Sequence, residues 1–328
     1  MKSRLALLAA GIVMVASASV RTQLGGSVYT RYEMDEMMSS FMLMGAEANV
    51  QAQVSSETRD IFTAAIQLSA GTSMPGWTSG FHFGEAYVLV PTALGWPTFK
   101  VGQAPVPFGL LADYDIHRQI VQTSYARVLG LRLDPGAGLL GTLGPAAYRL
   151  WVSNGNGPFA TDGDKDKLVT MRIAPTFLLG NADLAVGLSV LAGKLPYWSL
   201  DSPDNTMAGP QTSAMKYRLG LDNTTTWGPA VFRLEAVAGR DSSLSSANAF
   251  GYYAEARYAV FDWLEPLAKY DGWHTQEGSA RNLSVGLTVR PEQVSLLELE
   301  AVYQLDFLNT RTRNERNWSA AVQLAASF

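Results

Sequence analysis

Charged side chains that recur at every second position are the residues of this sequence best placed to do chemistry. In the segment 230–240, for example, Arg233 and Glu235 alternate with the apolar Phe232 and Leu234. Charges of both signs on one strand face need water or an oppositely charged group, because a buried unpaired charge is strongly destabilising. The pattern therefore predicts a water-lined face that attracts, repels or orients charged solutes.

The candidate residues for such a water-lined site come from most of the chain. They are Lys100, Asp113, Asp115, His117, Arg118, Arg127, Arg149, Arg172, Arg218, Arg233, Arg257, Lys269, Glu298 and Glu300. Arginine is concentrated in the middle of the chain, whereas acids recur near both ends, where Glu33 and Glu47 add to Glu298 and Glu300. If the sheet closes on itself, its ends become neighbours and a basic wall would face an acidic wall. We expect the resulting field to orient small zwitterionic or charged solutes.

Catalytic chemistry has little support in these residues. The three histidines, His82, His117 and His274, are not spaced as metal ligands, and the glycine-rich stretch 136–144 lacks a phosphate-binding lysine. Cysteine is absent, which excludes disulfides, thiolate metal sites and thiol nucleophiles. The net charge of −4 gives no basic footprint for nucleic acid. We expect neither an enzyme nor a cofactor.

One acidic loop has the spacing that begins a calcium-binding loop. Asp162, Asp164 and Asp166 stand at alternate positions, but the downstream bidentate glutamate of an EF-hand is missing. An ordinary solvated loop is favoured over a calcium site.

The elements that carry these side chains alternate with the period of β-strands. The alternations run for about ten residues, which is the length that a tilted strand needs to cross a hydrocarbon core; strands of soluble proteins are usually shorter. We place about sixteen strands, at 22–34, 38–54, 59–70, 80–90, 98–104, 124–133, 146–154, 167–178, 183–194, 214–225, 229–240, 248–260, 263–273, 281–290, 296–307 and 316–328. In lipid such a sheet must close, because an open edge would leave backbone groups unpaired. The predicted fold class is an all-β, antiparallel transmembrane barrel.

The connections alternate in length, as expected for short periplasmic turns and longer extracellular loops. The short ones are 55–58, 91–96, 179–182, 227–228 and 291–295, with 134–145 as a longer exception. The long ones are 71–79, 105–123, 155–166, 195–213 and 241–247. A soluble sandwich has no reason to place all its long loops at one end.

Tryptophans lie close to both kinds of connection. Trp96, Trp227 and Trp263 are next to short turns, and Trp77, Trp198 and Trp273 are next to long loops. Two girdles at the lipid–water interfaces would explain this placement, since indole is apolar with one polar donor. The aromatic core of a soluble β protein is the alternative.

The N-terminal segment 1–18 is expected to be a secretory signal peptide. Lys2 and Arg4 precede the apolar stretch 5–15, and Ala16 and Ala18 form an A-x-A cleavage pattern. The stretch is too short for a spanning helix, which needs about 20 residues, although an uncleaved anchor is the alternative. Residues 19–328 would then form the barrel. The last residue, Phe328, ends an alternating segment and resembles the recognition end of barrels that are assembled into the outer membrane.

Several blocks resemble the phosphate-selective porin O/P family. They are FKVGQAPVPFG at 99–109, YRLWVSNGNG at 148–157, GYYAE at 251–255 and LEPLAKYD at 264–271. The resemblance implies a sixteen-stranded, usually trimeric, outer-membrane channel whose third loop, here 105–123, folds inward. Phosphate-selective members carry an arginine ladder and a lysine cluster. The mixed charges of Asp113, Asp115, His117 and Arg118 depart from that pattern, which puts phosphate selectivity in doubt.

The function we expect is that of a porin in the bacterial outer membrane. It would be in contact with lipid and lipopolysaccharide and would allow passive diffusion of small hydrophilic or charged solutes and ions. The alternative is a structural barrel that sheathes a partner protein, such as a multihaem cytochrome. Any haem would belong to the partner, because nothing in this sequence binds haem.

Overall fold

The structure of the protein is a computed structural model. It describes residues 19–71, 80–92, 97–110, 120, 126–129, 131–158, 165–196, 213–242, 246–275, 278–292, 294, 296–310 and 314–328. The predicted signal peptide, 1–18, lies outside these residues. Within them, no helix is long and apolar enough to cross a bilayer.

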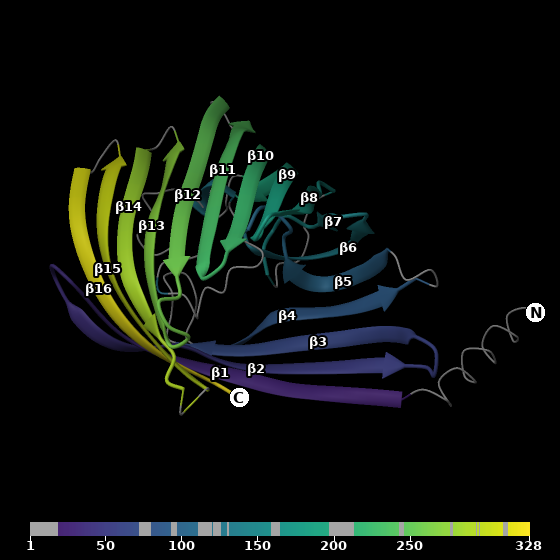
Figure 1. Cartoon of the computed structure of the whole chain (residues 1–328). Helices are drawn as coiled ribbons and strands as arrows, with labels where there is room; N and C mark the ends of the chain where they lie inside the picture. The colour runs from purple at the N-terminus through teal and green to yellow at the C-terminus, as the bar shows by residue number, and fades with distance from the viewer. Residues whose placement is uncertain are drawn as a thin grey trace, which may run out of the picture.

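Sixteen β-strands form one sheet in the described part of the chain (Figure 1). Their bounds are β1 (Ser19–Asp35), β2 (Ser39–Ser55), β3 (Asp60–Gly71), β4 (Gly80–Pro91), β5 (Thr98–Pro105), β6 (Leu133–Leu143), β7 (Ala146–Ser153), β8 (Leu168–Leu179), β9 (Ala182–Pro196), β10 (Ser213–Trp227), β11 (Ala230–Ser242), β12 (Ser246–Tyr258), β13 (Leu264–Thr275), β14 (Gly278–Val289), β15 (Leu297–Thr310) and β16 (Asn314–Ser327). A short helix, α2 (Ala126–Leu129), lies between β5 and β6. Each strand pairs with its neighbours in sequence and β1 pairs with β16, so the sheet is a closed antiparallel barrel.

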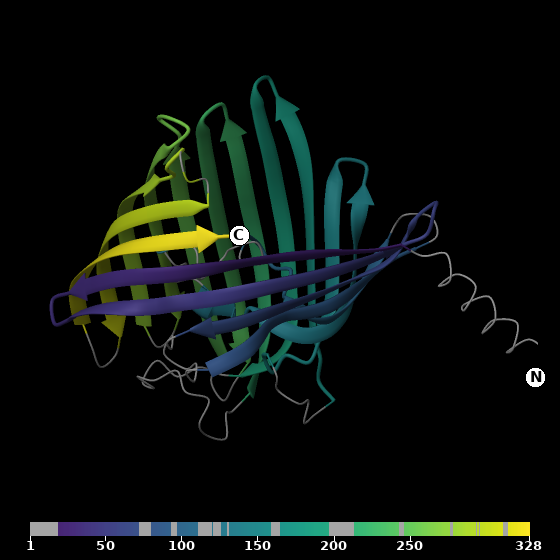
Figure 2. The same cartoon turned by 90° about the horizontal axis from the view of Figure 1, so that it is seen from below.

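The β1–β16 seam closes the barrel through backbone hydrogen bonds. Pairing begins at Ser27 opposite Ser327, and the N–H of Gly26 donates to the carbonyl of Phe328 at 2.9 Å. A Cβ at Gly26 would lie 2.5 Å from the Phe328 ring and 2.7 Å from a backbone oxygen, so this close approach requires glycine. Residues 19–25 pair only with β2, and this part of the β1–β2 hairpin extends past the end of β16 (Figure 2).

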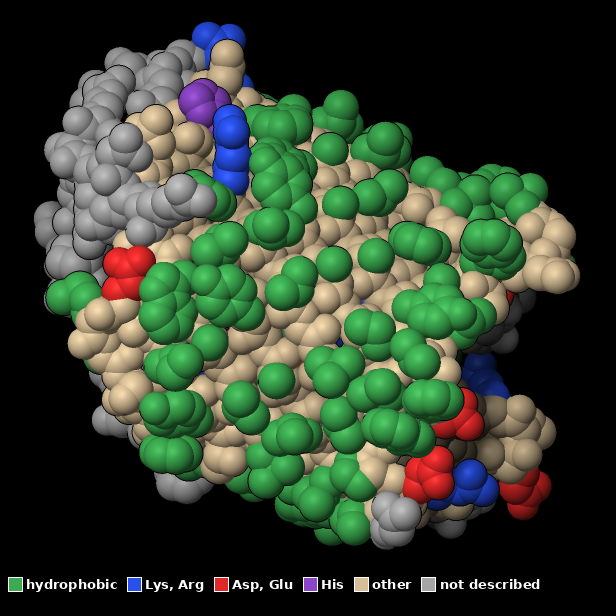
Figure 3. Space-filling view, turned by 60° about the vertical axis from the view of Figure 1, so that its left-hand side comes forward, with side chains coloured by type: hydrophobic (Ala, Val, Ile, Leu, Met, Phe, Trp, Pro, Cys, Tyr) green, Lys and Arg blue, Asp and Glu red, His purple; other side chains and the backbone are tan. Residues whose placement is uncertain are grey.

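The two faces of the sheet have opposite character. Leu219 and Leu221 point outward and are more than half exposed, whereas Arg218 and Glu235 point inward and are 4% and 3% exposed. On the face of the barrel that Figure 3 shows, apolar side chains are spread over the outer surface between the two ends. This arrangement inverts the pattern of a soluble protein, in which exposed apolar patches stay small. It matches a barrel whose outer face meets lipid, and the predicted fold class is confirmed.

One predicted strand is wrong. The segment 124–133 contains α2, and the strand runs instead from Leu133 to Leu143, inside the stretch that we expected to be a connection. The strand was predicted to be a connection because its sequence is rich in glycine, which weakens the strand pattern. The glycines are needed because the Trp151 side chain packs on them: a Cβ at Gly138 would lie 2.6 Å from its ring. The true turn is only Gly144 and the following proline, so the longer exception among the short connections disappears.

An apolar cluster fills part of the barrel interior. Phe108, Val128 and Leu129, which lie between β5 and β6, pack with inward-facing residues that include Leu191 and Trp273. The assignment of Trp273 to an aromatic girdle is therefore wrong, because its side chain is 3% exposed and faces inward.

The other tryptophans assigned to the girdles divide into two groups. Trp227 is exposed on the outer face at the end of β10, as expected, and Trp263 is exposed in the turn before β13. Trp77, Trp96 and Trp198 lie outside the described residues.

Candidate functional site

Nine of the candidate charged residues lie on the inner face of the barrel wall. They are Lys100, Arg149, Arg172, Arg218, Arg233, Arg257, Lys269, Glu298 and Glu300. Each alternates along its strand with residues that are more exposed on the outer face. Arg127 is part of α2, but its side chain is not described. Asp113, Asp115, His117 and Arg118 lie outside the described residues.

An ion pair between β8 and β10 bridges the intervening strand β9. The Arg172 guanidinium donates two hydrogen bonds to Asp222, of 3.0 Å from Nε and 2.6 Å from Nη2. The carboxylate lies over Gly187 of β9, where a Cβ would approach an oxygen of Asp222 to 2.2 Å. A glycine at this position therefore creates the space in which the two side chains meet.

A second pair fastens the barrel wall to α2. Arg218 on β10 forms a salt bridge with Asp241 on β11, and its Nε donates to the carbonyl oxygen of Val128 at 2.7 Å. Because one guanidinium serves both partners, the ion pair also fixes the helix inside the barrel.

A longer network of charges runs from β11 to β15. Its centre is Arg257, which lies 2.9 Å from Glu255, 3.1 Å from Glu265 and 4.0 Å from Glu300. Arg233 also donates to Glu255, at 2.9 Å. The network continues through Arg290, which bonds Glu298 at 2.8 Å and Glu265 at 3.4 Å. Charges of alternating sign are thus held side by side along the inner wall.

These pairs overturn the expectation of a basic wall opposite an acidic wall. The arginines of β8, β10, β11 and β12 each meet an acid on the same or a nearby strand. The three acids of these pairs, Asp222, Asp241 and Glu255, were not among the candidates. Each of these acids is at even spacing from an arginine of its own strand, so alternation could have assigned it to the inner face. Pairing neutralises charge locally, so the described wall has no separated halves.

The segment that follows β5 is held inside the barrel at two places, and both lie in the part of the segment that the structure describes. At one end, Gly109 N–H donates to Ser189 Oγ at 2.9 Å, and Leu110 N–H donates to Glu235 Oε2 at 3.0 Å. At the other end, Ile120 N–H donates to Glu300 Oε2 at 3.0 Å. Ser189 and Glu235 belong to β9 and β11, whereas Glu300 belongs to β15, so the segment is anchored on separate parts of the wall.

Phe108 packs closely at the first of these anchors. Its side chain is 1% exposed, and a Cβ at Gly220 of β10 would lie 2.7 Å from its ring. The motif PFG thus places an aromatic ring in a recess of the wall, next to the polar anchors Ser189 and Glu235. No pattern in the sequence indicates that these two residues serve as anchors.

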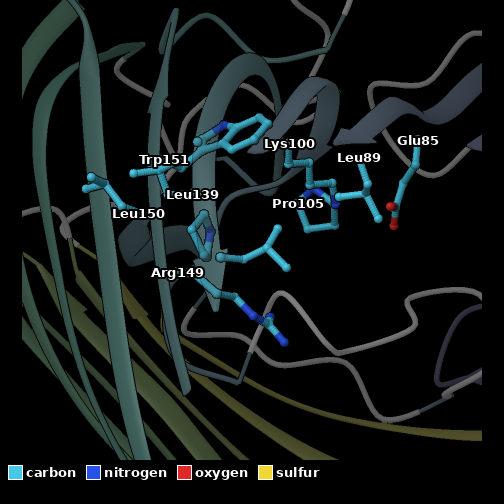
Figure 4. Close-up of a pocket in the computed structure, with 11 residues that line it drawn as sticks. Glu85, Leu89, Lys100, Pro105, Leu139, Arg149, Leu150 and Trp151 are labelled. Atoms are coloured by element: carbon cyan, nitrogen blue, oxygen red, sulfur yellow. The ribbon is translucent and has the colours of Figure 1, made fainter. Parts of the chain in front are cut away.

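A cavity opens in the inner wall where this segment leaves β5. Its volume is about 280 Å³, and its lining includes Glu85, Lys100, Arg149 and Trp151 (Figure 4). Two basic groups, one acidic group and an indole ring thus meet in one recess.

The described residues give no metal centre. No group of three or more His, Asp or Glu side chains among them is placed to hold a metal ion. Of the calcium candidates, Asp162 and Asp164 lie outside the described residues, and Asp166 forms a salt bridge of 3.2 Å with Lys194.

Comparison with known proteins identifies the architecture. The chain matches no model of a protein family and no curated protein. Among solved structures, it is similar to OmpT of Vibrio cholerae in its trimer form, an outer-membrane protein, with a TM-score of 0.71 at 11% identity over 94% of this chain and 100% of that one. It is also similar to the outer-membrane channel DcaP of Acinetobacter baumannii, with a TM-score of 0.70 at 12% identity over 95% and 98%.

A third similar structure is the anion-selective porin from Comamonas acidovorans. Its TM-score is 0.69 at 12% identity, over 94% of this chain and 100% of that chain. At such low identities the likeness shows the fold alone, which is the closed sixteen-stranded barrel of outer-membrane porins. It does not single out the phosphate-selective porin O/P family.

Proposed function

We propose that this protein is a porin of the bacterial outer membrane that allows passive diffusion of small hydrophilic or charged solutes and ions. The observation that carries the proposal is the opposite character of the two faces of the closed sheet: apolar residues such as Leu219 point outward, and charged residues such as Arg218 point inward. A water-filled interior accommodates those charges, and lipid accommodates the apolar belt. The proposal requires no catalytic group.

The segment 105–123 is proposed to be the constriction of this pore. Its anchoring to Ser189, Glu235 and Glu300 supports the proposal, because it brings backbone into the path between distant strands. Lys100 and Arg149 on the wall, with Asp113, Asp115, His117 and Arg118 of the segment, are the residues proposed to select solutes there. A kinship with the phosphate-selective porin O/P family remains part of the proposal. Selectivity for phosphate does not, because the described arginines of β8, β10, β11 and β12 are paired with acids.

We propose a homotrimer as the assembly, supported by the similarity to the trimer form of OmpT. A barrel that sheathes a multihaem cytochrome is the less favoured function. The interior already contains Phe108, Val128 and Leu129, which occupy space that a protein threaded through the barrel would need.

Conductance in a planar lipid bilayer tests the proposal. The purified protein, extracted with detergent, should produce stepwise current increments, and the reversal potential in a salt gradient would give the ion preference. The same preparation unfolded by heat serves as the control. A folded protein that inserts into the bilayer but conducts no ions would overturn the proposed pore.

A further inference from the structure

The cavity beside the proposed constriction has the composition of a binding site. Six of its lining residues face the interior from four neighbouring strands: Glu85 and Leu89 of β4, Lys100 of β5, Leu140 of β6, and Arg149 and Trp151 of β7. Pro105 and Pro107 close one side. Its volume of about 280 Å³ is close to the lower end of the range for small-molecule pockets, about 300–1,000 Å³.

The strand register forms the middle of this site. Leu89 pairs with Lys100, Lys100 with Gly138, and Gly138 with Trp151, so these four residues form one row across four strands. Trp151 packs over Gly138, and its side chain is 3% exposed. Leu89 and Trp151 therefore supply an apolar strip. Lys100 lies within this strip, with its Nζ 3.7 Å from the centre of the Tyr87 ring.

Opposite charges flank the row. Arg149 is two residues from Trp151 along β7, on the side of the row that also contains Leu140, its pairing partner. Glu85 is four residues from Leu89 along β4, on the other side of the row. Glu85 is at even spacing from Leu89 and lines the cavity from the same face, next to a β-bulge of β4 between Phe83 and Ala86. Glu85 and Arg149 thus lie on opposite sides of the cavity, with Lys100 and Leu89 between them (Figure 4).

We propose that this cavity binds short zwitterionic peptides that carry one apolar side chain. The peptide carboxylate would lie between Lys100 and Arg149, its ammonium group would face Glu85, and its side chain would contact Leu89 and Trp151. A simple anion would bring like charge toward Glu85, and a simple cation would bring like charge toward Lys100 and Arg149. Only a molecule with both charges places an opposite charge at each end of the cavity.

The distance between the ends selects a dipeptide over a single amino acid. The rows of Glu85 and Arg149 are six residues apart along the strands, which corresponds to roughly 20 Å of backbone. The row of Lys100 lies between these two rows, so a carboxylate bound to Lys100 is closer to Glu85 than one bound to Arg149 alone. The charges of a free α-amino acid are separated by a single carbon, whereas those of a dipeptide are separated by a peptide unit.

Block of the ion current by glycyl-L-leucine tests this site. The inference rests on the proposed function, because a solute reaches the cavity only through an open interior. N-acetyl-L-leucine lacks only the ammonium group, glycyl-L-leucine amide lacks the carboxylate, and glycylglycine lacks the apolar side chain. Glycyl-L-leucine should block at the lowest concentration. The two analogues that lack a charge should need about tenfold more, as expected when one charge-assisted contact is lost. Glycylglycine should also need about tenfold more, because it loses the apolar contact.

Two substitutions identify the cavity as the place of binding. Glu85→Gln should weaken block by glycyl-L-leucine about tenfold and leave block by N-acetyl-L-leucine unchanged. Arg149→Gln should weaken both, because both carry the carboxylate. Glu33→Gln, which removes an inward acid from β1 far from the cavity, is the matched control and should change neither. Heat-modifiable migration of each variant in gels, which reports a folded barrel, would exclude misfolding as the cause.

The outcomes separate this inference from the proposed function. A protein that conducts ions but is blocked equally by all four compounds, or equally in Glu85→Gln and the parent, overturns the peptide site and leaves the porin intact. A folded, inserted protein that conducts no ions overturns the porin. In that case saturation-transfer NMR of glycyl-L-leucine with the detergent-solubilised protein still measures binding, and an absence of transfer refutes the site.

Discussion

Replacing Asp222 by asparagine should both destabilise the barrel and change its ion preference. The carboxylate accepts two hydrogen bonds from Arg172, of 2.6 and 3.0 Å, and the two side chains are 1% and 10% exposed. Removing one member of a buried ion pair costs about 3–5 kcal/mol, because the other charge is left without its counter-ion. The free energy of unfolding should fall by that amount, and the reversal potential should shift toward anions.

Urea unfolding of the protein in lipid vesicles, followed by tryptophan fluorescence, measures the first effect, and bilayer recording measures the second. Asp183→Asn on β9 is the matched control, since that aspartate is exposed. The combined substitutions Arg172→Met and Asp222→Leu should recover most of the stability, because apolar replacements of a buried pair are often neutral. If Asp222→Asn is no more destabilising than Asp183→Asn, the Arg172–Asp222 pair does not behave as a buried ion pair.

Three further substitutions test the seam and the inward segment. Phe108→Ala should lower the free energy of unfolding by about 3 kcal/mol and raise single-channel conductance, as the segment loses its apolar anchor; an unchanged conductance would contradict a constricting role. Gly26→Ala should reduce the folded fraction seen as heat-modifiable migration in gels, because its Cβ would overlap Phe328; normal folding would show that the seam adapts. Glu300→Gln should weaken the bond to Ile120 by about 1.5 kcal/mol and speed proteolysis of the segment in the folded barrel, whereas unchanged cleavage would mean that this bond does not hold it.

The alternation of apolar and polar residues predicted most of this fold, because the face that a side chain occupies depends only on its position along its own strand. Leu219 and Arg218 lie on opposite faces whatever strand pairs beside them, so the two faces can be predicted from the sequence alone. The pattern failed for β6, because Gly136 and Gly138 have no side chain to show which face they occupy. The reason for those glycines is Trp151, a residue on the next strand.

The sequence does not show which residues of neighbouring strands lie side by side, and the ion pairs depend on this register. Arg172 and Asp222 are two strands apart and meet over Gly187, which no local pattern predicts. Trp273 is different, because it shares a face with Lys269 and Asp271 and could have been assigned to the interior from alternation alone. Its nearness to a loop suggested the girdle instead.

The β1–β16 seam imposes an order on biogenesis. Arg31 bonds Gln323 across it at 2.8 Å, although the two residues are 292 positions apart in sequence. Contacts between such distant segments form slowly, because a long loop must first close. The first strand therefore has no seam partner until the last strand has been synthesised, and in the meantime both edges of the growing sheet can pair with other chains. A barrel built this way benefits from a chaperone that shields those edges, or from an assembly machine that holds the first strand until the last arrives.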